Sequence, residues 1–384
     1  EFQSWEILSG KGGQGSYFNP TFLSPNGESQ VTGHSTQIIT DKAIEWLKKR
    51  DHKKPFLLCT QFKVPHIHRL PPINRMHGYD DIEFPVPETF FDDFSSRSSF
   101  VSETWMALKG MKGHVLNIAP TMEEIKKSPK IRPPFLHEMN SKQQKAWHSA
   151  YDPRNLRYQK LIQEGKLQGE TKSLYIYQRF IKDYVRCVDG LDDQIGRILN
   201  FLDEHNLTEN TLVIYSSDQG FFTGEHGWAE KRWMYEESFR SPLLMRWPKM
   251  VKPGTKITQL VQNIDLAPTF IKAAGLTPPE TVHGIALQPI LSNPSSRSWR
   301  KDILYQYFDG GTPTNRGPYN MPRHEGIRDK RYKLISFYDY KTWEFYDLKK
   351  DPEELHNLFN QESMKLEINR LQKRLRIKKA KFGL

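Results

Sequence analysis

A long helical stripe followed by short apolar runs constrains the fold of this chain more than any other feature. Apolar side chains recur every three or four positions from Phe180 to Leu202, which is the spacing of one face of an amphipathic helix. The apolar run at residues 211–215 ("TLVIY") follows and predicts a strand, as does the run inside 241–248 ("SPLLMRWP"). Helices that alternate with buried strands predict an α/β fold with helices on both faces of the sheet.

Other segments fit the same alternation. A helix is predicted to begin near Ser35, and residues 56–62 ("FLLCTQF") then predict a buried strand. Asp265 is predicted to cap the helix "LAPTFIKAA", which Gly275 ends. Residues 71–173 are polar and weakly periodic, so we expect short helices or an insertion over the surface there.

The pattern of apolar and polar residues changes after the break at residues 293–296 ("NPSS"). The runs "DILYQYF", "KRYKLISFY" and "WEFYDL" are typical of strands, and a last helix closes the chain. We therefore predict a catalytic domain at residues 1–295 and a small α+β subdomain at residues 296–384.

Composition excludes several classes of protein. No stretch approaches about 18 consecutive apolar residues, so no membrane span is expected. Two cysteines make neither a disulfide framework nor a zinc site, and no nucleic-acid motif accompanies the net charge of +11. That charge could bind an acidic polymer such as a sulfated glycan. The more ordinary interpretation is that the charged residues form a helix face exposed to solvent. The last helix holds six of the cations: Lys373, Arg374, Arg376, Lys378, Lys379 and Lys381.

Two predicted strands end in polar side chains that could bind a charged ligand. One is followed by Val64-Pro65-His66, the other by Asp218-Gln219, and Lys231 lies 13 residues beyond Asp218. Ligands of open α/β sheets gather at the carboxyl ends of strands, and carboxylate and amide oxygens suit Ca²⁺ or Mg²⁺. A cation, a lysine and a histidine together would suit an oxyanion. From the residues alone, a metal-assisted hydrolase and a set of ordinary turn residues both stay open.

The long motif "SSDQGFFTGEHGWAEKRWMYEESFRSPLLMRWP" strongly resembles the sulfatase family of the alkaline-phosphatase-like superfamily. "FKVPHIHRLPP", "NIDLAPTFIKAAG", "HEGIRDKRYKLI" and "FYDLKKDPEELHNL" support the resemblance, which covers nearly the whole chain and is weakest at residues 80–170. It implies a mixed, largely parallel sheet sandwiched by helices, with a small C-terminal α+β subdomain. It also implies a periplasmic, extracellular or lysosomal sulfuric ester hydrolase.

The resemblance also implies roles for individual residues. Asp218 and Gln219 match calcium ligands, with Gln219 a mild departure from the commoner Asn or His. Lys231 and His66 match groups that contact the sulfate. The implied substrate is a sulfated carbohydrate, with no nucleic acid as partner. His324 and Arg328 could reach the sugar or equally staple the small subdomain to the large one.

The sequence departs from the family pattern at the nucleophile. Sulfatases use a Cys-x-Pro-Ser-Arg cysteine converted to formylglycine, and neither Cys59 nor Cys187 has that context. The paired aspartates that complete the calcium site are also missing. We expect a sequence that lacks its N-terminal part, and therefore no activity from these 384 residues alone. The alternatives are a phosphodiesterase or phosphonate hydrolase of the same superfamily, and a non-catalytic sulfatase-like protein that binds glycans.

Overall fold

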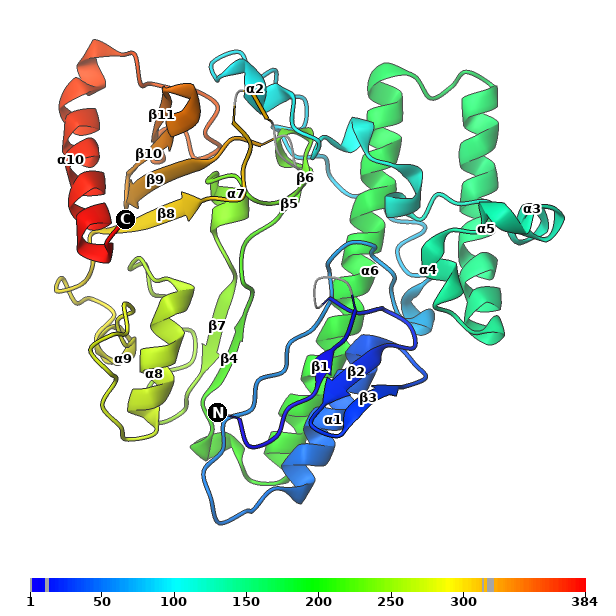
Figure 1. Ribbon diagram of the computed structural model, residues 1–384, viewed down its shortest axis with the longest axis horizontal. Coiled ribbons are helices and arrows are strands. Elements are labelled where there is room, and N and C mark those ends of the chain that lie inside the picture. Colours follow the sequence, from blue (N-terminus) through cyan, green and yellow to red (C-terminus); the bar gives the residue numbers. More distant parts are fainter. Residues whose placement is uncertain (1, 11–13, 313, 316–320) are drawn as a thin grey trace. The chain divides into compact units, whose positions relative to one another are not determined.

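The computed structural model describes residues 2–10, 14–312, 314–315 and 321–384. The chain divides into two compact units (Figure 1). The first comprises Glu1–Val86 and Leu108–Leu207, and the second comprises Pro87–Ala107 and Thr208–Leu384. The domain boundary between residues 295 and 296 stays a prediction.

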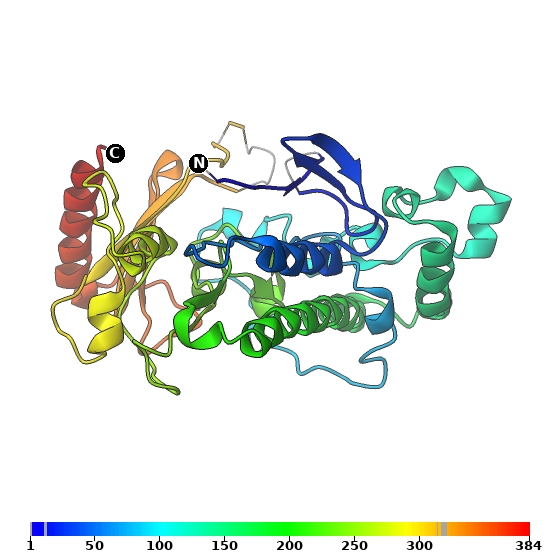
Figure 2. The same ribbon diagram turned by 90° about the horizontal axis from the view of Figure 1, so that it is seen from below.

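Helices make up most of the regular structure of the first unit. α1 (Ser35–Lys49) and α6 (Gly169–Glu204) pack side by side (Figure 2). Both confirm the predicted helices, although α6 begins well before the stripe that predicted it. No helix in the described part of the chain is both long and apolar enough to cross a membrane. The unit also contains β1 (Ile7–Leu8), β2 (Thr21–Ser24), β3 (Gly27–Gln30), α3 (Met122–Lys127), α4 (Pro134–His137) and α5 (Ser141–Gln163).

One prediction in the first unit is wrong, and another is incomplete. Residues 56–62 form no strand, because no neighbouring strand pairs with them among the described residues; alternate side chains are only half buried, and Leu57 is 53% exposed. The weakly periodic region contains α5, a helix of 23 residues, and not only short helices. Its start carries a capping box between Asn140 and Gln143, a pattern that is readable in the sequence.

The small C-terminal subdomain is confirmed as a sheet covered by a helix. Its strands are ordered β11-β10-β9-β8, all neighbours antiparallel, and α10 (Lys365–Phe382) packs on one face (Figure 1). Ile327, Leu334 and Phe345 of the sheet form one buried cluster with apolar side chains of α10. The strands are β8 (Asp302–Tyr307), β9 (His324–Asp329), β10 (Tyr332–Phe337) and β11 (Thr342–Asp347).

The two remaining predicted strands form an antiparallel pair. β4 (Val213–Ser216) pairs with β7 (Leu243–Arg246), so that Ser216 lies opposite Leu243. The mixed helix-and-sheet class is confirmed, and the strand pairs formed by the described residues are antiparallel. For β4 and β7 the reason is the connection between them, which returns the chain to the same end of the pair instead of crossing over. The second unit also holds α2 (Ser99–Ser102), β5 (Phe222–Thr223), β6 (Ala229–Glu230), α7 (Glu236–Phe239), α8 (Leu266–Ala273) and α9 (Gln288–Ser292).

The start of α8 corrects the predicted cap. Asp265 occupies the cap position, but its side chain makes no capping hydrogen bond to α8 and accepts from the Gln262 N–H at 2.8 Å, in the turn before the helix. Its buried carboxylate also accepts two bonds from the Arg300 guanidinium, each 2.6 Å long. An arginine competes well for a carboxylate because its paired N–H groups match both oxygens. Gly275 lies beyond the helix at a φ of 76°, as predicted for a helix-ending glycine.

Candidate active site

The end of β4 presents the two predicted metal ligands. Asp218 is exposed and Gln219 is half buried, and the Gln219 Nε2 lies 3.4 Å from the Asp218 Oδ2. Gly220 follows, and its N–H donates to the Ser238 carbonyl at 2.9 Å. A Cβ at position 220 would lie 2.1 Å from the Glu237 carbonyl oxygen. Only glycine therefore allows this strand end to approach the backbone of α7 so closely.

Gly220→Ala is expected to destabilise the protein by about 1–3 kcal/mol, the usual cost of overpacking against backbone that cannot move. The measurement is the free energy of unfolding in denaturant. Gly196→Ala is the matched control, because a Cβ there meets nothing within 4 Å and α6 should gain about 0.5–1 kcal/mol. Equal effects at the two positions would contradict the close approach.

Lys231 follows a short hairpin that brings it to the same place. β5 pairs with β6, with Phe222 opposite Glu230. The Lys231 Nζ lies 3.2 Å from the Glu230 Oε2 and 5.9 Å from the centre of the Phe221 ring. The residue is only 7% exposed, so it does not lie on a solvated helix face.

Ser238 of α7 joins the two segments. Its carbonyl accepts from the Gly220 N–H, and its Oγ accepts from the Arg232 N–H at 2.8 Å. Residue 220 is two positions from Asp218, and residue 232 is next to Lys231. The structure therefore attaches the segments that carry the predicted metal ligands and the predicted lysine to one serine.

The turn at Gly224-Glu225-His226-Gly227 has a structural explanation. The buried His226 ring places its Nδ1 2.7 Å from the Asp92 Oδ2, and the His226 N–H donates to the Thr89 Oγ1 at 3.1 Å. Burial alone would raise the pKa of Asp92, but the His226 hydrogen bond and the Arg97 charge lower that pKa to about 2. The turn thus fixes the hairpin that carries Lys231.

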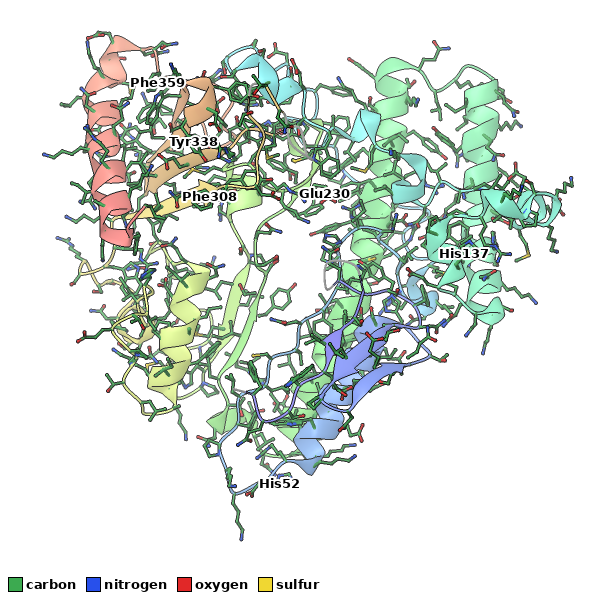
Figure 3. All side chains as sticks on the ribbon, viewed as in Figure 1. His52, His137, Glu230, Phe308, Tyr338 and Phe359 are labelled. Atoms are coloured by element: carbon green, nitrogen blue, oxygen red, sulfur yellow. The ribbon has the colours of Figure 1, made fainter. Side chains whose placement is uncertain are left out.

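Glu230 and Arg232 are candidate site residues that the sequence reasoning missed. Both have left-handed backbone, with φ of 85° and 100°, which is rare for residues other than glycine. Glu230 (Figure 3) is 2% exposed, and its Oε2 lies 4.0 Å from the Arg232 Nη1. Strain of this kind gathers at functional sites. The triplet Glu-Lys-Arg was visible in the sequence, but its backbone strain was not.

Arg328 and a buried lysine hold the start of α7. The Arg328 guanidinium donates to both carboxylate oxygens of Glu236, at 3.2 and 3.0 Å. The Lys333 Nζ lies 2.8 Å from a carboxylate oxygen of Glu236 and 2.8 Å from one of Glu354. Burial would raise the pKa of Glu236, yet the charges of Lys333 and Arg328 lower that pKa to about 2. These ion pairs fix the helix whose Ser238 organises the site.

His324 lies in the core beside the same segment. Its ring stacks on Trp233 at 5.7 Å, and its Nδ1 donates to the Pro322 carbonyl at 2.9 Å. Since a carbonyl only accepts, the proton sits on Nδ1 and the Nε2 keeps a lone pair. That Nε2 has no hydrogen-bond partner in the described part of the chain. Burial lowers the pKa of His324 to about 4, so the ring is neutral at pH 7.

His66 belongs to the first unit, whereas the five other predicted residues belong to the second. The His66 side chain is half buried, and its Nδ1 lies 2.9 Å from the Ile67 carbonyl. The Tyr17 hydroxyl donates to the His66 carbonyl at 2.5 Å, which fixes the backbone of this segment.

The donor set fits part of a calcium site. Ca²⁺ takes about six to eight oxygen ligands, and Asp218 with Gln219 offers hard carboxylate and amide oxygens. The described residues hold no group of three or more His, Cys, Asp or Glu side chains suited to a metal ion. Asp218 and Gln219 can therefore supply a share of the coordination shell and not all of it.

Comparison with known families places the chain. The sequence model of the sulfatase family matches residues 5–276. The chain belongs to the sulfatase family. A second model, the C-terminal part of N-sulphoglucosamine sulphohydrolase, matches residues 224–381. Asp218 and Lys231 lie in the first match, and His324 and Arg328 in the second.

Individual relatives agree with the family. N-acetylglucosamine-6-O-sulfatase of Bacteroides thetaiotaomicron is 38% identical over 363 residues, which are 93% of this chain and 63% of that protein. This sulfatase sequence thus spans less than two thirds of that relative's length. The solved structure of BT4656 with its substrate D-glucosamine-2-N, 6-O-disulfate matches with a TM-score of 0.93 and 36% identity, over 100% of this chain and 76% of that one.

A solved relative with a different named activity shares the fold. The phosphonate monoester hydrolase of Silicibacter pomeroyi matches with a TM-score of 0.62 at 18% identity, over 90% of this chain and 60% of that one. Likeness at that identity concerns the fold alone. The α/β sulfatase fold is therefore confirmed.

Proposed function

We propose that the whole protein is a sulfatase that hydrolyses a sulfate ester on a glucosamine unit of a sulfated glycan. One observation carries the proposal: the match to BT4656, solved with a disulfated glucosamine, extends over the whole chain at a TM-score of 0.93. The geometry agrees, because the strand end with Asp218 and the hairpin with Lys231 meet at Ser238.

Lys231 is the group we propose to stabilise the reacting sulfate. Its ammonium group is held between the Glu230 carboxylate and the Phe221 ring, in a site from which most water is excluded. A charge fixed in advance stabilises a developing oxyanion without reorganising at the moment of reaction. His66 stays a proposed sulfate contact, as its match to the family motif implies.

Asp218 and Gln219 are proposed to bind calcium, and formylglycine to be the nucleophile, as in the family. When bound, calcium would withdraw charge from a sulfate oxygen. The residues of this chain then have separate tasks: Asp218 and Gln219 hold the ion, and Lys231 neutralises charge. The proposed compartment is the periplasm, a lysosome or the extracellular space, again as in the family.

His324 and Arg328 are both proposed as structural residues. Arg328 is engaged by both oxygens of Glu236, which supports the staple over contact with sugar. The His324 ring is 0% exposed and packs against Trp233 and Phe337, which likewise supports a packing role over contact with sugar.

Hydrolysis of glucosamine sulfates tests the proposed function. The whole protein is incubated with N-acetylglucosamine-6-sulfate, and released sulfate is measured by ion chromatography. A phosphonate monoester serves as the competing substrate, since the fold also occurs in a phosphonate hydrolase. Release of sulfate with a higher kcat/KM than phosphonate hydrolysis is expected. The reverse order would favour the phosphonate alternative, and no turnover of either would favour a glycan-binding protein.

Asp218→Ala is expected to remove most of the stabilisation that Ca²⁺ gives the whole protein. A ligand at about 100 times its Kd stabilises by about 2.7 kcal/mol, and the variant loses a charged ligand. The measurement is the melting temperature with and without Ca²⁺. The exposed Asp309, replaced by alanine, is the control and should respond like the wild type. An unchanged calcium response in Asp218→Ala would reduce Asp218 to a turn residue.

A further inference from the structure

The last helix, α10, concentrates the positive charge of the chain. It spans 18 residues and carries eight basic side chains and one acidic one, a net charge of +7 within a total of +11. A helix that only packs on its own sheet does not need this excess. The positions of these charges show which of them stabilise the fold and which are available to bind a ligand.

One group of these cations serves the fold. Arg374 and Lys378 pair with Asp302 at 2.7 and 2.9 Å, and Lys379 pairs with Glu325 at 2.7 Å. Both acids belong to strands of the sheet under the helix. These cations flank the buried apolar side of α10, so they attach the helix to the sheet.

A second group of three cations faces outward. Lys373, Arg376 and Lys381 are exposed, and the described part of the chain offers them no carboxylate partner. At about 100° per residue, position 373 points away from the buried Leu371 and Leu375, and positions 376 and 381 lie about 60° and about 80° from it, one on each side. The three cations extend over about 12 Å along the helix axis, at a rise of about 1.5 Å per residue. They form an uncompensated basic strip, named here the outer strip.

We propose that the outer strip, Lys373, Arg376 and Lys381, is an exosite that binds the chain of a sulfated polysaccharide. The class of ligand rests on the proposed function, because an enzyme for sulfated glycans meets a polyanion that extends beyond the hydrolysed unit. Charge complementarity supports the assignment: an outward patch of cations that pairs with no carboxylate among the described residues fits a run of sulfates. Arginine and lysine both bind sulfate-like anions through charged hydrogen bonds.

The same helix is a poorer fit to a membrane surface. A helix that lies in a bilayer interface needs a free apolar face. The apolar face of α10 is already used, because Ile368, Leu371 and Leu375 are buried against the sheet. Exposed Leu366 and Ile377 are single apolar residues and not a continuous face.

The outer strip is separate from the candidate active site. Within the second unit, α10 packs against Ile327 and Leu334 of the sheet, whereas the buried cluster with Trp233 and Tyr235 contains Ile335 and Phe337. Successive residues of a strand face opposite sides of a sheet, so α10 and the segment after Lys231 lie on different faces. Loss of the strip should therefore weaken the binding of long glycans and leave the turnover of a monosaccharide unchanged.

The test compares two triple variants of the whole protein. One is Lys373→Gln, Arg376→Gln and Lys381→Gln, which removes the charge while keeping a polar side chain and a similar helix propensity. The other is Lys126→Gln, Lys127→Gln and Lys130→Gln, which removes an equal charge from an exposed cluster of the first unit. The probe is a heparin dodecasaccharide, with binding measured by calorimetry at several salt concentrations. Vesicles of anionic phosphatidylserine are the second probe.

The outer-strip variant is expected to bind heparin about tenfold more weakly, and the slope of log K against log salt concentration should fall by about two. The heparin affinity of the control variant should stay within about twofold of the wild type. Release of sulfate from N-acetylglucosamine-6-sulfate should be the same in all three proteins. If heparin affinity fell equally in both variants, the effect would come from net charge alone, and the proposal would be overturned. A variant that loses vesicle binding and keeps heparin binding would also overturn it. The heparin result stands apart from catalysis, so a failure of the proposed hydrolysis would be recognised separately.

Discussion

Replacing Lys231 with alanine is expected to lower kcat/KM of the whole protein on a glucosamine sulfate by about 10²–10³, the usual loss when one preorganised oxyanion partner is removed. The ammonium group is 3.2 Å from Glu230 and the residue is only 7% exposed, so water cannot readily replace it. Its burial also means that the variant should lose some stability, because the Glu230 carboxylate is left with the Arg232 guanidinium 4.0 Å away. The rate and the melting temperature are therefore measured on the same variant.

Two further variants separate a catalytic role from a structural one. Lys231→Met keeps the bulk of the side chain and removes its charge, so it should lose activity as Lys231→Ala does, with a smaller fall in melting temperature. Lys330→Ala, in an exposed position of the second unit, should change neither quantity. If Lys231→Met keeps a rate within a few-fold of the wild type, Lys231 is a packing residue and leaves the proposed site.

Local patterns predicted the parts of this fold that local forces determine. The stripe from Phe180 to Leu202 predicted α6, because a helix with one buried face has an apolar residue at every third or fourth position. The runs that became β4, β7, β8, β10 and β11 were likewise apolar enough to stand out. Residues 56–62 had the same texture and form no strand, since a strand depends on a neighbour that its own sequence does not specify.

The candidate site was predictable in its residue types but not in its geometry. Asp218, Gln219 and Lys231 were recognised as a motif, but their meeting depends on Ser238, which had no special signal in the sequence. The strands that deliver Lys231 have two residues each, too short for any periodicity. Burial of Lys231 depends on Glu230 and on tertiary packing, which no local pattern of the sequence shows. Such contacts are long-range properties of the fold.

Lys333→Met is expected to destabilise the protein by about 3–5 kcal/mol, the usual cost of breaking a buried ion pair from one side. Lys333 is 0% exposed, and its ammonium group lies between Glu236 and Glu354 while donating to the Met234 carbonyl at 2.7 Å. Glu236 would keep Arg328, but Glu354 would lose its cation. The measurement is the free energy of unfolding at pH 7. A loss below about 1 kcal/mol, typical of a surface pair, would contradict the buried network.

The pH dependence of stability tests whether the stability lost in Lys333→Met comes from the unpaired carboxylate of Glu354. Burial, which outweighs the charge of Lys333, raises the pKa of Glu354 from 4.5 to about 7. Between these values the folded protein holds a proton that the unfolded chain releases, so this group makes stability fall as pH rises from about 4.5 to about 7. This dependence on pH should change in two variants.

Glu354→Gln should flatten the decline of stability with pH, because an amide does not titrate. In Lys333→Met the decline should be steeper and extend to higher pH, since the cation that lowers the pKa of Glu354 is gone. Adding Glu354→Gln to Lys333→Met should then recover much of the lost stability at pH 7. Additive costs in the double variant would mean that the two side chains contribute independently, and that Glu354 is not the charge stranded by the loss of Lys333.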